Sequence, residues 1–369
     1  MPTSDLIRVS FVDQLDGAAL LTLYPANCSV PPSACVQLAV TTDGGLSWRA
    51  EGGFLPLAST VLSDVGAVDW ESPTFGYAWS SSDLLRIDDK GQYQRIQSPP
   101  GLVSPSIQSV SVLGDSLWAA FSCGGPTSQC STPLWSWSSR SGWQPISLPV
   151  QPAGSGPVEI VRPSPRTDFL LTYGTDQAGW LFASNDGGST WTRSAIPCGS
   201  LTRKGSNGTV HATATPDSIA LVPGGSGAPT SAALVLECVG AAGVGYQALS
   251  FWSRHSLSAG TWQLQSDNVA GDLPAVGVAP SMGYASDLVA TPGSVWIALG
   301  RSPPYRSTDD GHIWEEAPEL GTEVAHDVLK DSTLGPGILD FVNARDGWCL
   351  YWELWRTTDG GATWTRMPG

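Results

Sequence analysis

Three stretches of the chain share one pattern of apolar and polar positions. Each begins with an apolar-polar-aromatic triplet, continues through a short polar turn, and restarts at a glycine that precedes an apolar run. Alternation with a period of two is typical of β-strands, and the polar break is typical of a hairpin. The pattern therefore predicts a unit that opens with two antiparallel strands, and its copies are Val9-Ser10-Phe11 before Gly17, Val68-Asp69-Trp70 before Gly76, and Leu339-Asp340-Phe341 before Gly347.

A second pattern, Ser/Thr-x-Asp-x-Gly-x-x-Trp, occurs four times. The short Asp side chain can accept hydrogen bonds from the backbone N–H groups that follow it, and the glycine allows the positive φ of a tight reversal. The tryptophan then lies on the outgoing strand, where we expect it to be buried against a neighbouring copy. The turn aspartates are Asp43, Asp186, Asp309 and Asp359, and the tryptophans are Trp48, Trp191, Trp314 and Trp364.

These turns resemble the Asp-box, or bacterial neuraminidase repeat, of β-propellers such as sialidases, sortilin-like receptors, xyloglucan-degrading enzymes and photosystem II assembly factors. The layout of residues 335–369 is most similar to the assembly-factor type. The resemblance implies the propeller fold, in which the Asp-box turns are structural and lie on the outer rim. It does not imply one activity, because these proteins share a fold and differ in function.

The spacing of the turn aspartates sets the number of units. Asp43 and Asp186 are 143 residues apart, Asp186 and Asp309 are 123 apart, and Asp309 and Asp359 are 50 apart. With about 40–50 residues for a four-stranded blade, we predict an all-β fold in which one domain, residues 1–369, forms a single seven-bladed β-propeller of antiparallel blades. Six or eight blades are the alternatives. The expected blades are residues 6–50, 64–97, 105–148, 157–197, 208–265, 280–318 and 335–369.

Composition agrees with many short strands and limits the partners. The chain has 42 Gly, 29 Pro and 17 Trp, and 41% of its residues are hydrophobic, which is enough for a core. A net charge of −15 with only 18 Lys and Arg argues against binding nucleic acid or an anionic membrane surface. No apolar run approaches the roughly 20 residues of a membrane span.

The seven cysteines favour an exported protein. Cys28 with Cys35 and Cys123 with Cys130 are each seven residues apart, so each pair can close its own loop, and Cys198 with Cys238 is a third possible pair. Cys349 is left over and is interpreted as a buried thiol. No recognisable signal peptide is present at Met1-Pro2-Thr3, so the chain is interpreted as a mature or trimmed form or as the exported part of a larger protein. We expect it to be secreted or otherwise exported and to be a monomer. Scattered histidines and the absence of a metal or phosphate-loop motif predict no metal and no cofactor.

Candidate chemistry lies on the inner strands, because propellers generally bind ligands around the central axis. Asp69 and Asp340 occupy matching places and are the candidate general acid and base or nucleophile of a glycosidase. The other reading is that both line a repeated strand without reacting. Candidate binding residues are Arg8, Arg162, His211 and Asp287, with Trp70, Trp118, Trp296, Trp348, Tyr351 and Trp352 as aromatic platforms.

The function expected from these residues is recognition. An arginine triad and an early Arg-Ile-Pro motif, which sialidases need, are missing, so sialidase activity is not expected. We expect an exported recognition or scaffold propeller that binds a glycan polymer or a protein partner at its axial face. The alternative is a carbohydrate-active hydrolase or lyase that uses axial carboxylates and tryptophan platforms.

Overall fold

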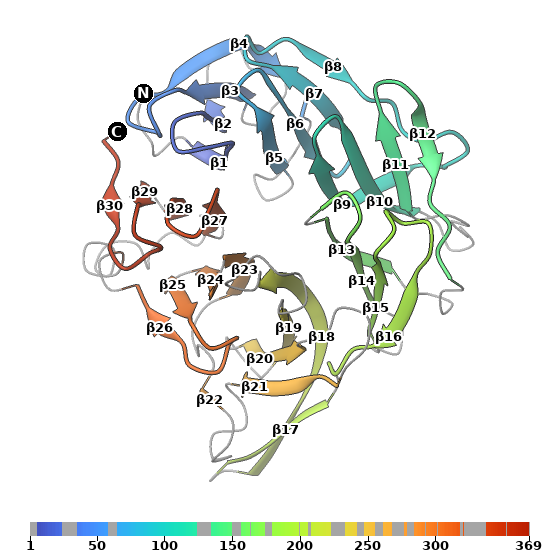
Figure 1. Cartoon of the computed structure of the whole chain (residues 1–369), viewed down its shortest axis with the longest axis vertical. Coiled ribbons are helices and arrows are strands. Elements are labelled where there is room, and N and C mark those ends of the chain that lie inside the picture. Colours follow the sequence, from blue (N-terminus) through green and yellow to red (C-terminus); the bar gives the residue numbers. More distant parts are fainter. Residues whose placement is uncertain are drawn as a thin grey trace.

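The computed structural model is an all-β ring of seven sheets (Figure 1). It describes residues 6–23, 35–57, 65–123, 134–149, 156–162, 164–173, 179–198, 200–205, 208–222, 233–241, 247–254, 261–267, 277–278, 284–291, 293–300, 302–317, 320, 337–351 and 353–368. Within these ranges the sheets follow one another along the chain, and six of the seven have four antiparallel strands. The predicted propeller of four-stranded antiparallel blades is confirmed.

The strands of blades one to four, from the innermost outward, follow the order predicted from the sequence. Blade one has β1 (Leu6–Phe11), β2 (Gly17–Leu23), β3 (Cys35–Thr41) and β4 (Arg49–Leu55). Blade two has β5 (Val65–Ser72), β6 (Phe75–Ser80), β7 (Leu84–Asp88) and β8 (Tyr93–Arg95). Blade three has β9 (Pro105–Leu113), β10 (Ser116–Cys123), β11 (Leu134–Ser138) and β12 (Gly142–Pro145). Blade four has β13 (Gly156–Val161), β14 (Asp168–Tyr173), β15 (Gly179–Ser184) and β16 (Thr192–Ala195).

Blade five is wider than the expected residues 208–265. Its six strands are β17 (Ser200–Gly205), β18 (Gly208–Val222), β19 (Ala233–Ala241), β20 (Gln247–Arg254), β21 (Gln263–Asp267) and β22 (Gly277–Val278). Blade six has β23 (Tyr284–Thr291), β24 (Ser294–Gly300), β25 (Ser302–Ser307) and β26 (Glu315–Glu316). Blade seven has β27 (Ile338–Phe341), β28 (Gly347–Tyr351), β29 (Glu353–Thr357) and β30 (Thr365–Arg366).

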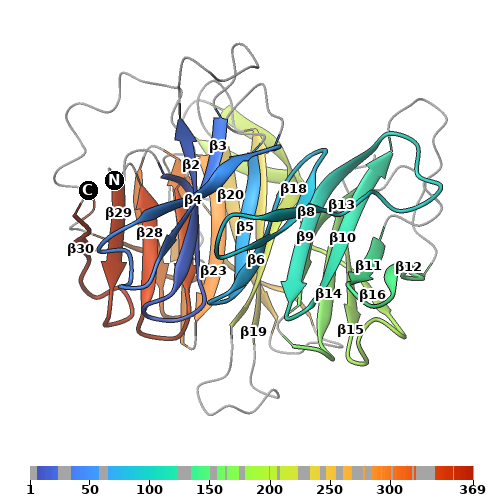
Figure 2. The same cartoon turned by 90° about the horizontal axis from the view of Figure 1, so that it is seen from above.

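The ring closes by packing blade one against blade seven, which lie side by side in both views (Figures 1 and 2). The innermost strands contact their neighbours all the way round, including β27 with β1. Apolar residues of both blades share one core cluster, in which Phe11 stacks on Trp348 with ring centroids 3.6 Å apart. The closure therefore rests on noncovalent contacts between the two blades.

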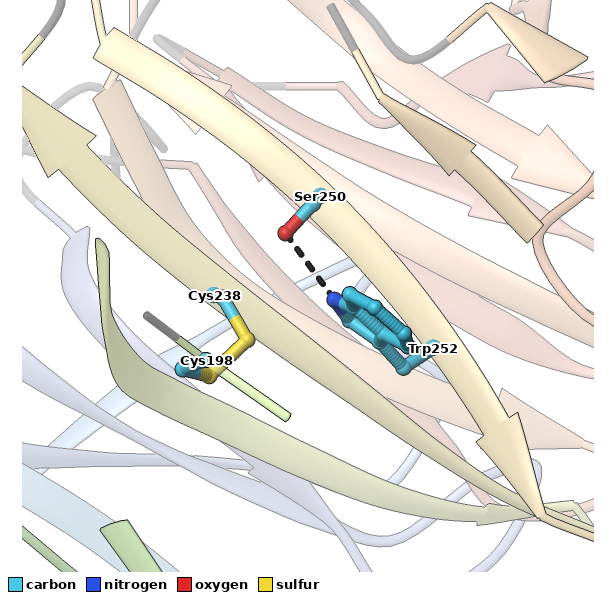
Figure 3. The surroundings of a disulfide bond; sticks show 4 residues. All are labelled: Cys198, Cys238, Ser250 and Trp252. Atoms are coloured by element: carbon cyan, nitrogen blue, oxygen red, sulfur yellow. Dashed lines mark hydrogen bonds between the residues drawn. A yellow bond between two sulfur atoms is a disulfide. The ribbon is translucent and has the colours of Figure 1, made fainter. Parts of the chain in front are cut away.

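One of the expected disulfides is described in full, and it joins Cys198 to Cys238. It ties a position two residues before β17 to β19, beside the strand that carries Ser250 and Trp252 (Figure 3). Cys35 is also disulfide-bonded, whereas Cys28, Cys130 and the side chain of Cys123 lie outside the described residues. Cys349 is a free, fully buried thiol, and burial raises its pKa well above the ordinary value.

Candidate functional site

Ser10, Asp69 and Asp340 occupy equivalent positions on the inner strands of blades one, two and seven. The aromatic residue that follows each of them is paired with a glycine on the next strand: Phe11 with Gly17, Trp70 with Gly76, and Phe341 with Gly347. A Cβ atom at any of these glycines would overlap the aromatic ring. The glycine-aromatic pairing seen in the sequence thus fixes the register of the first hairpin, and with it the place of the polar residue.

At two of these positions the polar side chain joins its blade to the next one. The Asp340 carboxylate accepts a hydrogen bond from the Phe11 N–H at 2.5 Å, and the Ser10 hydroxyl accepts one from the Trp70 N–H at 2.9 Å. Three further junctions carry the same kind of bond, with Leu339 N–H donating to Asp287, Ile160 N–H to Ser109, and Ile219 N–H to Glu159. These acceptors satisfy inner-strand N–H groups that have no other strand beside them.

Asp69 differs from its counterparts. Within the described residues its carboxylate accepts no hydrogen bond, and its side chain is half-buried. Blade three is joined to blade two by other groups: the Gly114 N–H donates to Glu71 at 2.6 Å and the Ile107 N–H donates to the Ser81 carbonyl at 2.8 Å. Asp69 is therefore a carboxylate on an inner strand that the ring does not use for joining blades.

Burial and like charge raise the proton affinity of both candidate catalytic groups. Burial, together with the charges of Glu71 and Asp340, raises the pKa of Asp69 to about 8. Burial and the charge of Asp287 raise the pKa of Asp340 to about 7, although the Phe11 N–H opposes the increase. Because their charges influence one another, Asp69, Asp340 and Asp287 form one acidic group on the inner strands of blades two, seven and six.

Arg8 adds a positive charge to this acidic group, and its nearest effect is on Asp287. Burial raises the pKa of Asp287 to about 6, and the Leu339 N–H and the Arg8 guanidinium oppose the increase. Burial lowers the pKa of Arg8, and the charge of Asp287 partly restores it. Arg8 Nη1 also donates to the Ile7 carbonyl at 2.7 Å. Arg8 thus brings positive charge to the acidic group, and it acts most directly on Asp287.

Arg162 lies with Glu71 and is not among the charges that act on Asp69. Its guanidinium covers the Trp118 ring at 4.4 Å from the centroid. Burial raises the pKa of Glu71, while the Gly114 N–H and the Arg162 charge oppose the increase. Glu71 was missed as a candidate, although it lies only two residues from Asp69, at an irregularity of β5 between Trp70 and Ser72.

The expected aromatic platforms are structural. Trp70, Trp118, Trp296 and Trp348 are at most 5% exposed, so the prediction that they offer flat surfaces to a ligand is wrong. They pack under neighbouring strands and turns, where burying the large apolar indole stabilises the propeller. Tyr351 is buried as well, Trp352 lies outside the described residues, and the side chain of His211 is not described.

The backbone of His211 lies in an unexpected place. It pairs with Thr202 in the part of β18 that extends outward from the ring (Figure 1). The structure therefore does not place His211 at the inner-strand positions that hold Asp69, Asp340 and Asp287. The sequence pattern missed this because β18 is 15 residues long, so only its second half pairs with β19 in the blade.

The repeated turns join blades on the outer side. Asp43 accepts hydrogen bonds from both the N–H and the hydroxyl of Ser47, and Asp186 and Asp359 form the same pair of bonds with Thr190 and Thr363. The Asp309 carboxylate accepts the backbone N–H of Ile313 in the same way, but isoleucine has no hydroxyl to donate a second bond. Each turn covers an aromatic or apolar residue of the preceding blade. At Gly361, where φ is 81°, a side chain would overlap Trp296.

The tryptophan of each turn packs across the same junction. Trp364 meets Trp296 with centroids 5.6 Å apart, and Trp314 meets Phe251 at 4.5 Å. Trp191 meets Trp118 at 5.9 Å, and Trp48 shares a core cluster with Trp348. All four indoles contact the neighbouring unit, but only Trp48 and Trp364 are buried there, and Trp191 and Trp314 are half-buried.

Two kinds of site are not found in the described part of the chain. No group of three or more His, Cys, Asp or Glu residues there is arranged to hold a metal ion. None of the helices searched there is long and apolar enough to cross a membrane. The arrangement that remains is a group of carboxyls that can exchange protons near neutral pH and accept hydrogen bonds from a bound group.

Comparisons with known proteins give the fold. No family model and no curated protein matches the chain. PorZ, a surface component of the type IX secretion system of Porphyromonas gingivalis, has a TM-score of 0.55 and 13% identity, covering 99% of this chain and 46% of PorZ. YCF48 bound to D1 peptide has a TM-score of 0.38 and 15% identity, covering 99% of this chain and 82% of that one.

YCF48 from Cyanidioschyzon merolae has a TM-score of 0.46 and 12% identity, covering 82% of this chain and 84% of that one. At such identities a likeness shows the fold alone. Together with the closed cycle of inner strands, the similarity to PorZ identifies the chain as a β-propeller.

Proposed function

We propose that this chain is an exported recognition propeller that binds a partner, either a protein segment or a glycan polymer, at the inner-strand site around Asp69. The observation that carries the proposal is the difference between Asp69 and its counterparts. Ser10 and Asp340 use their side chains to join blades, whereas no hydrogen bond within the described residues holds the Asp69 carboxyl, which is therefore available to a ligand.

Two further observations support recognition by an exported chain. Four of the predicted sugar platforms, Trp70, Trp118, Trp296 and Trp348, are buried and do not offer the surfaces that a carbohydrate-active enzyme would use. The Cys198–Cys238 disulfide supports export, because disulfides persist in oxidising compartments. Assignment of the repeated turns as Asp-boxes is part of the same proposal.

The alternative is a carbohydrate-active enzyme, and one observation favours it. The pKa values of Asp69 and Asp340, about 8 and about 7, would keep one carboxyl protonated and the other partly ionised near neutral pH. A general acid and a general base need such a division. Against it, Asp340 already holds the Phe11 N–H, and the tryptophans are buried.

The experiment compares Asp69→Asn with Asp340→Asn. The wild-type chain is screened on peptide and glycan arrays, and the affinity of the strongest binder is then measured for each variant. We expect Asp69→Asn to weaken binding at least about tenfold, about 1.4 kcal/mol, at unchanged thermal stability. Asp340→Asn should change the thermal stability, because Asp340 accepts the Phe11 N–H, and it should change the affinity less than Asp69→Asn does. Equal affinity of Asp69→Asn and wild type would refute the site.

A second measurement decides between recognition and catalysis. Release of reducing sugar is measured over a panel of glycans. Turnover by the wild type that disappears in both Asn variants would establish the enzyme and overturn recognition as the main function. Binding without turnover supports the scaffold.

A further inference from the structure

Blade five carries a two-stranded arm that no other blade has in the described part of the chain. Residues 208–213 of β18 pair with β17, and residues 214–222 pair with β19. The first half of β18 therefore leaves the blade together with β17, and both extend outward from the ring (Figure 1). The Cys198–Cys238 disulfide anchors the base of this arm to β19 (Figure 3).

The arm places β17 at the edge of the blade-five sheet. β17 is the terminal strand, so among the described strands it has a neighbour on one side only. A two-stranded ribbon is marginally stable in water, and its free N–H and C=O groups can pair with another extended chain. A third strand would satisfy those groups and stabilise the arm.

The charge of this part of the chain is opposite to that of the whole. From Gly187 to Pro216 the sequence contains Arg193, Arg203 and Lys204 and no Asp or Glu, although the net charge of the chain is −15. Arg203 and Lys204 are consecutive on β17 and lie opposite Val210 and Thr209 in the register. Successive residues of a strand belong to opposite faces, so these two positions fall on the two faces of β17.

We propose that the arm is a docking strand for an extended acidic segment of a partner protein, which adds to the free edge of β17. Backbone hydrogen bonds supply the affinity, as in other cases of strand addition. The two cations select acidic side chains on either face of the added strand. At physiological salt the Debye length is about 8 Å, so the local charge of the arm outweighs the distant charge of the blades. The arm lies apart from the Asp69 site and acts independently of it.

The test uses the full oxidised chain and a fluorescent octapeptide in which pairs of Glu alternate with pairs of Val, so that both faces of the added strand carry Glu. Anisotropy should show saturable binding that weakens as salt is added. The same octapeptide with Lys in place of Glu should bind at least about tenfold more weakly. The acidic peptide with an N-methyl group on every residue keeps its charge but has no N–H group to donate to the ladder, and we expect it not to bind. Equal binding of the methylated peptide would overturn strand addition.

A matched pair of variants tests the cations. Arg203→Glu with Lys204→Glu should weaken binding of the acidic peptide at least about tenfold, because the two substitutions replace attraction between opposite charges with repulsion between like charges. Lys90→Glu with Arg140→Glu changes the net charge equally at exposed positions on blades two and three and should leave affinity unchanged. Equal losses in both double variants would mean that only net charge matters and would refute the proposal.

A second copy of this chain is the competing occupant of the edge. Sedimentation of the wild type without peptide should show a monomer. A dimer that disappears in the Arg203→Glu and Lys204→Glu double variant would assign the edge to self-association and overturn the peptide proposal.

Discussion

The junction between blades seven and one and the junction between blades two and three hold the ring together in different ways. At the first, Asp340 accepts the Phe11 N–H, Trp348 Nε1 donates to the Gly44 carbonyl at 3.0 Å, and Phe11 stacks on Trp348. At the second, the contacts do not involve Asp69: Glu71 accepts the Gly114 N–H, and Trp143 Nε1 donates to the Gln97 carbonyl at 2.5 Å.

The difference shows which inner-strand carboxyl groups of this propeller are available to a ligand. An inner-strand carboxylate that holds a neighbouring blade cannot be offered to a ligand without loosening the ring. Where other groups hold the junction, the carboxylate at the same position is available. Position in the repeat alone therefore does not identify a functional residue, and its hydrogen-bond partner must be known.

The largest effect is expected from removing the indole at the closure. Trp348→Ala should lower the free energy of unfolding by about 3–5 kcal/mol, because the fully buried ring leaves a cavity between two blades. Trp143→Ala, at the junction of blades two and three, removes a half-buried ring and should cost less. Urea unfolding followed by circular dichroism measures both, and a larger loss for Trp143→Ala would reverse the comparison.

A smaller effect separates the two aspartates. Asp340→Ala leaves the Phe11 N–H without its acceptor, and the loss should be about 1–3 kcal/mol. Asp69→Ala removes no hydrogen bond within the described residues and relieves repulsion, so stability at pH 8 should be unchanged or slightly higher. Calorimetric melting of both variants at the same pH gives the answer. Equal destabilisation would show that Asp69 also holds its junction.

The smallest effect is a pH dependence that the same residues produce. Unfolded aspartates titrate near pH 3.9, whereas Asp287, Asp340 and Asp69 titrate at about 6, 7 and 8 in the fold. Between these limits the folded chain binds more protons, so its stability should fall as pH rises from about 4 to about 8. The melting temperature should accordingly drop between pH 6 and pH 8.5.

Asp69→Asn should flatten the upper part of this curve, because its carboxyl titrates last. Glu315→Gln, at an exposed position of β26, removes one negative charge without touching the inner strands and should keep the wild-type slope. A slope that stays the same in Asp69→Asn would show that the high proton affinity belongs to another group.

Much of the architecture could be predicted from the sequence, because the repeated turns and glycine-aromatic pairs are local signals. The hydrogen bonds of Asp43 to Ser47 and the packing of Phe11 over Gly17 each involve residues close in the chain. The pattern also located Asp69 and Asp340 on equivalent strand positions.

The roles of those positions could not be predicted. The bond from Phe11 to Asp340 joins residues 329 apart, and no local pattern indicates whether such a partner exists. The tryptophans were misjudged for a related reason: alternation shows that two faces of a strand differ, but both faces of an inner blade strand can be covered by other blades. The predicted bounds of blade five left out Ser200–Gly205, because no turn motif in the sequence links this segment to β18.

The way each turn covers the blade before it also has a consequence for assembly. Gly361 of blade seven lies on Trp296 of blade six, and Gly188 of blade four lies on Trp118 of blade three. These are head-to-tail contacts, which form a ring only when the rotation per unit divides the circle. The contact between Gly44 and Trp348 is of the same kind, so the closure is one more head-to-tail step that lacks a peptide link. A circularly permuted chain, opened between two other blades, should build the same ring.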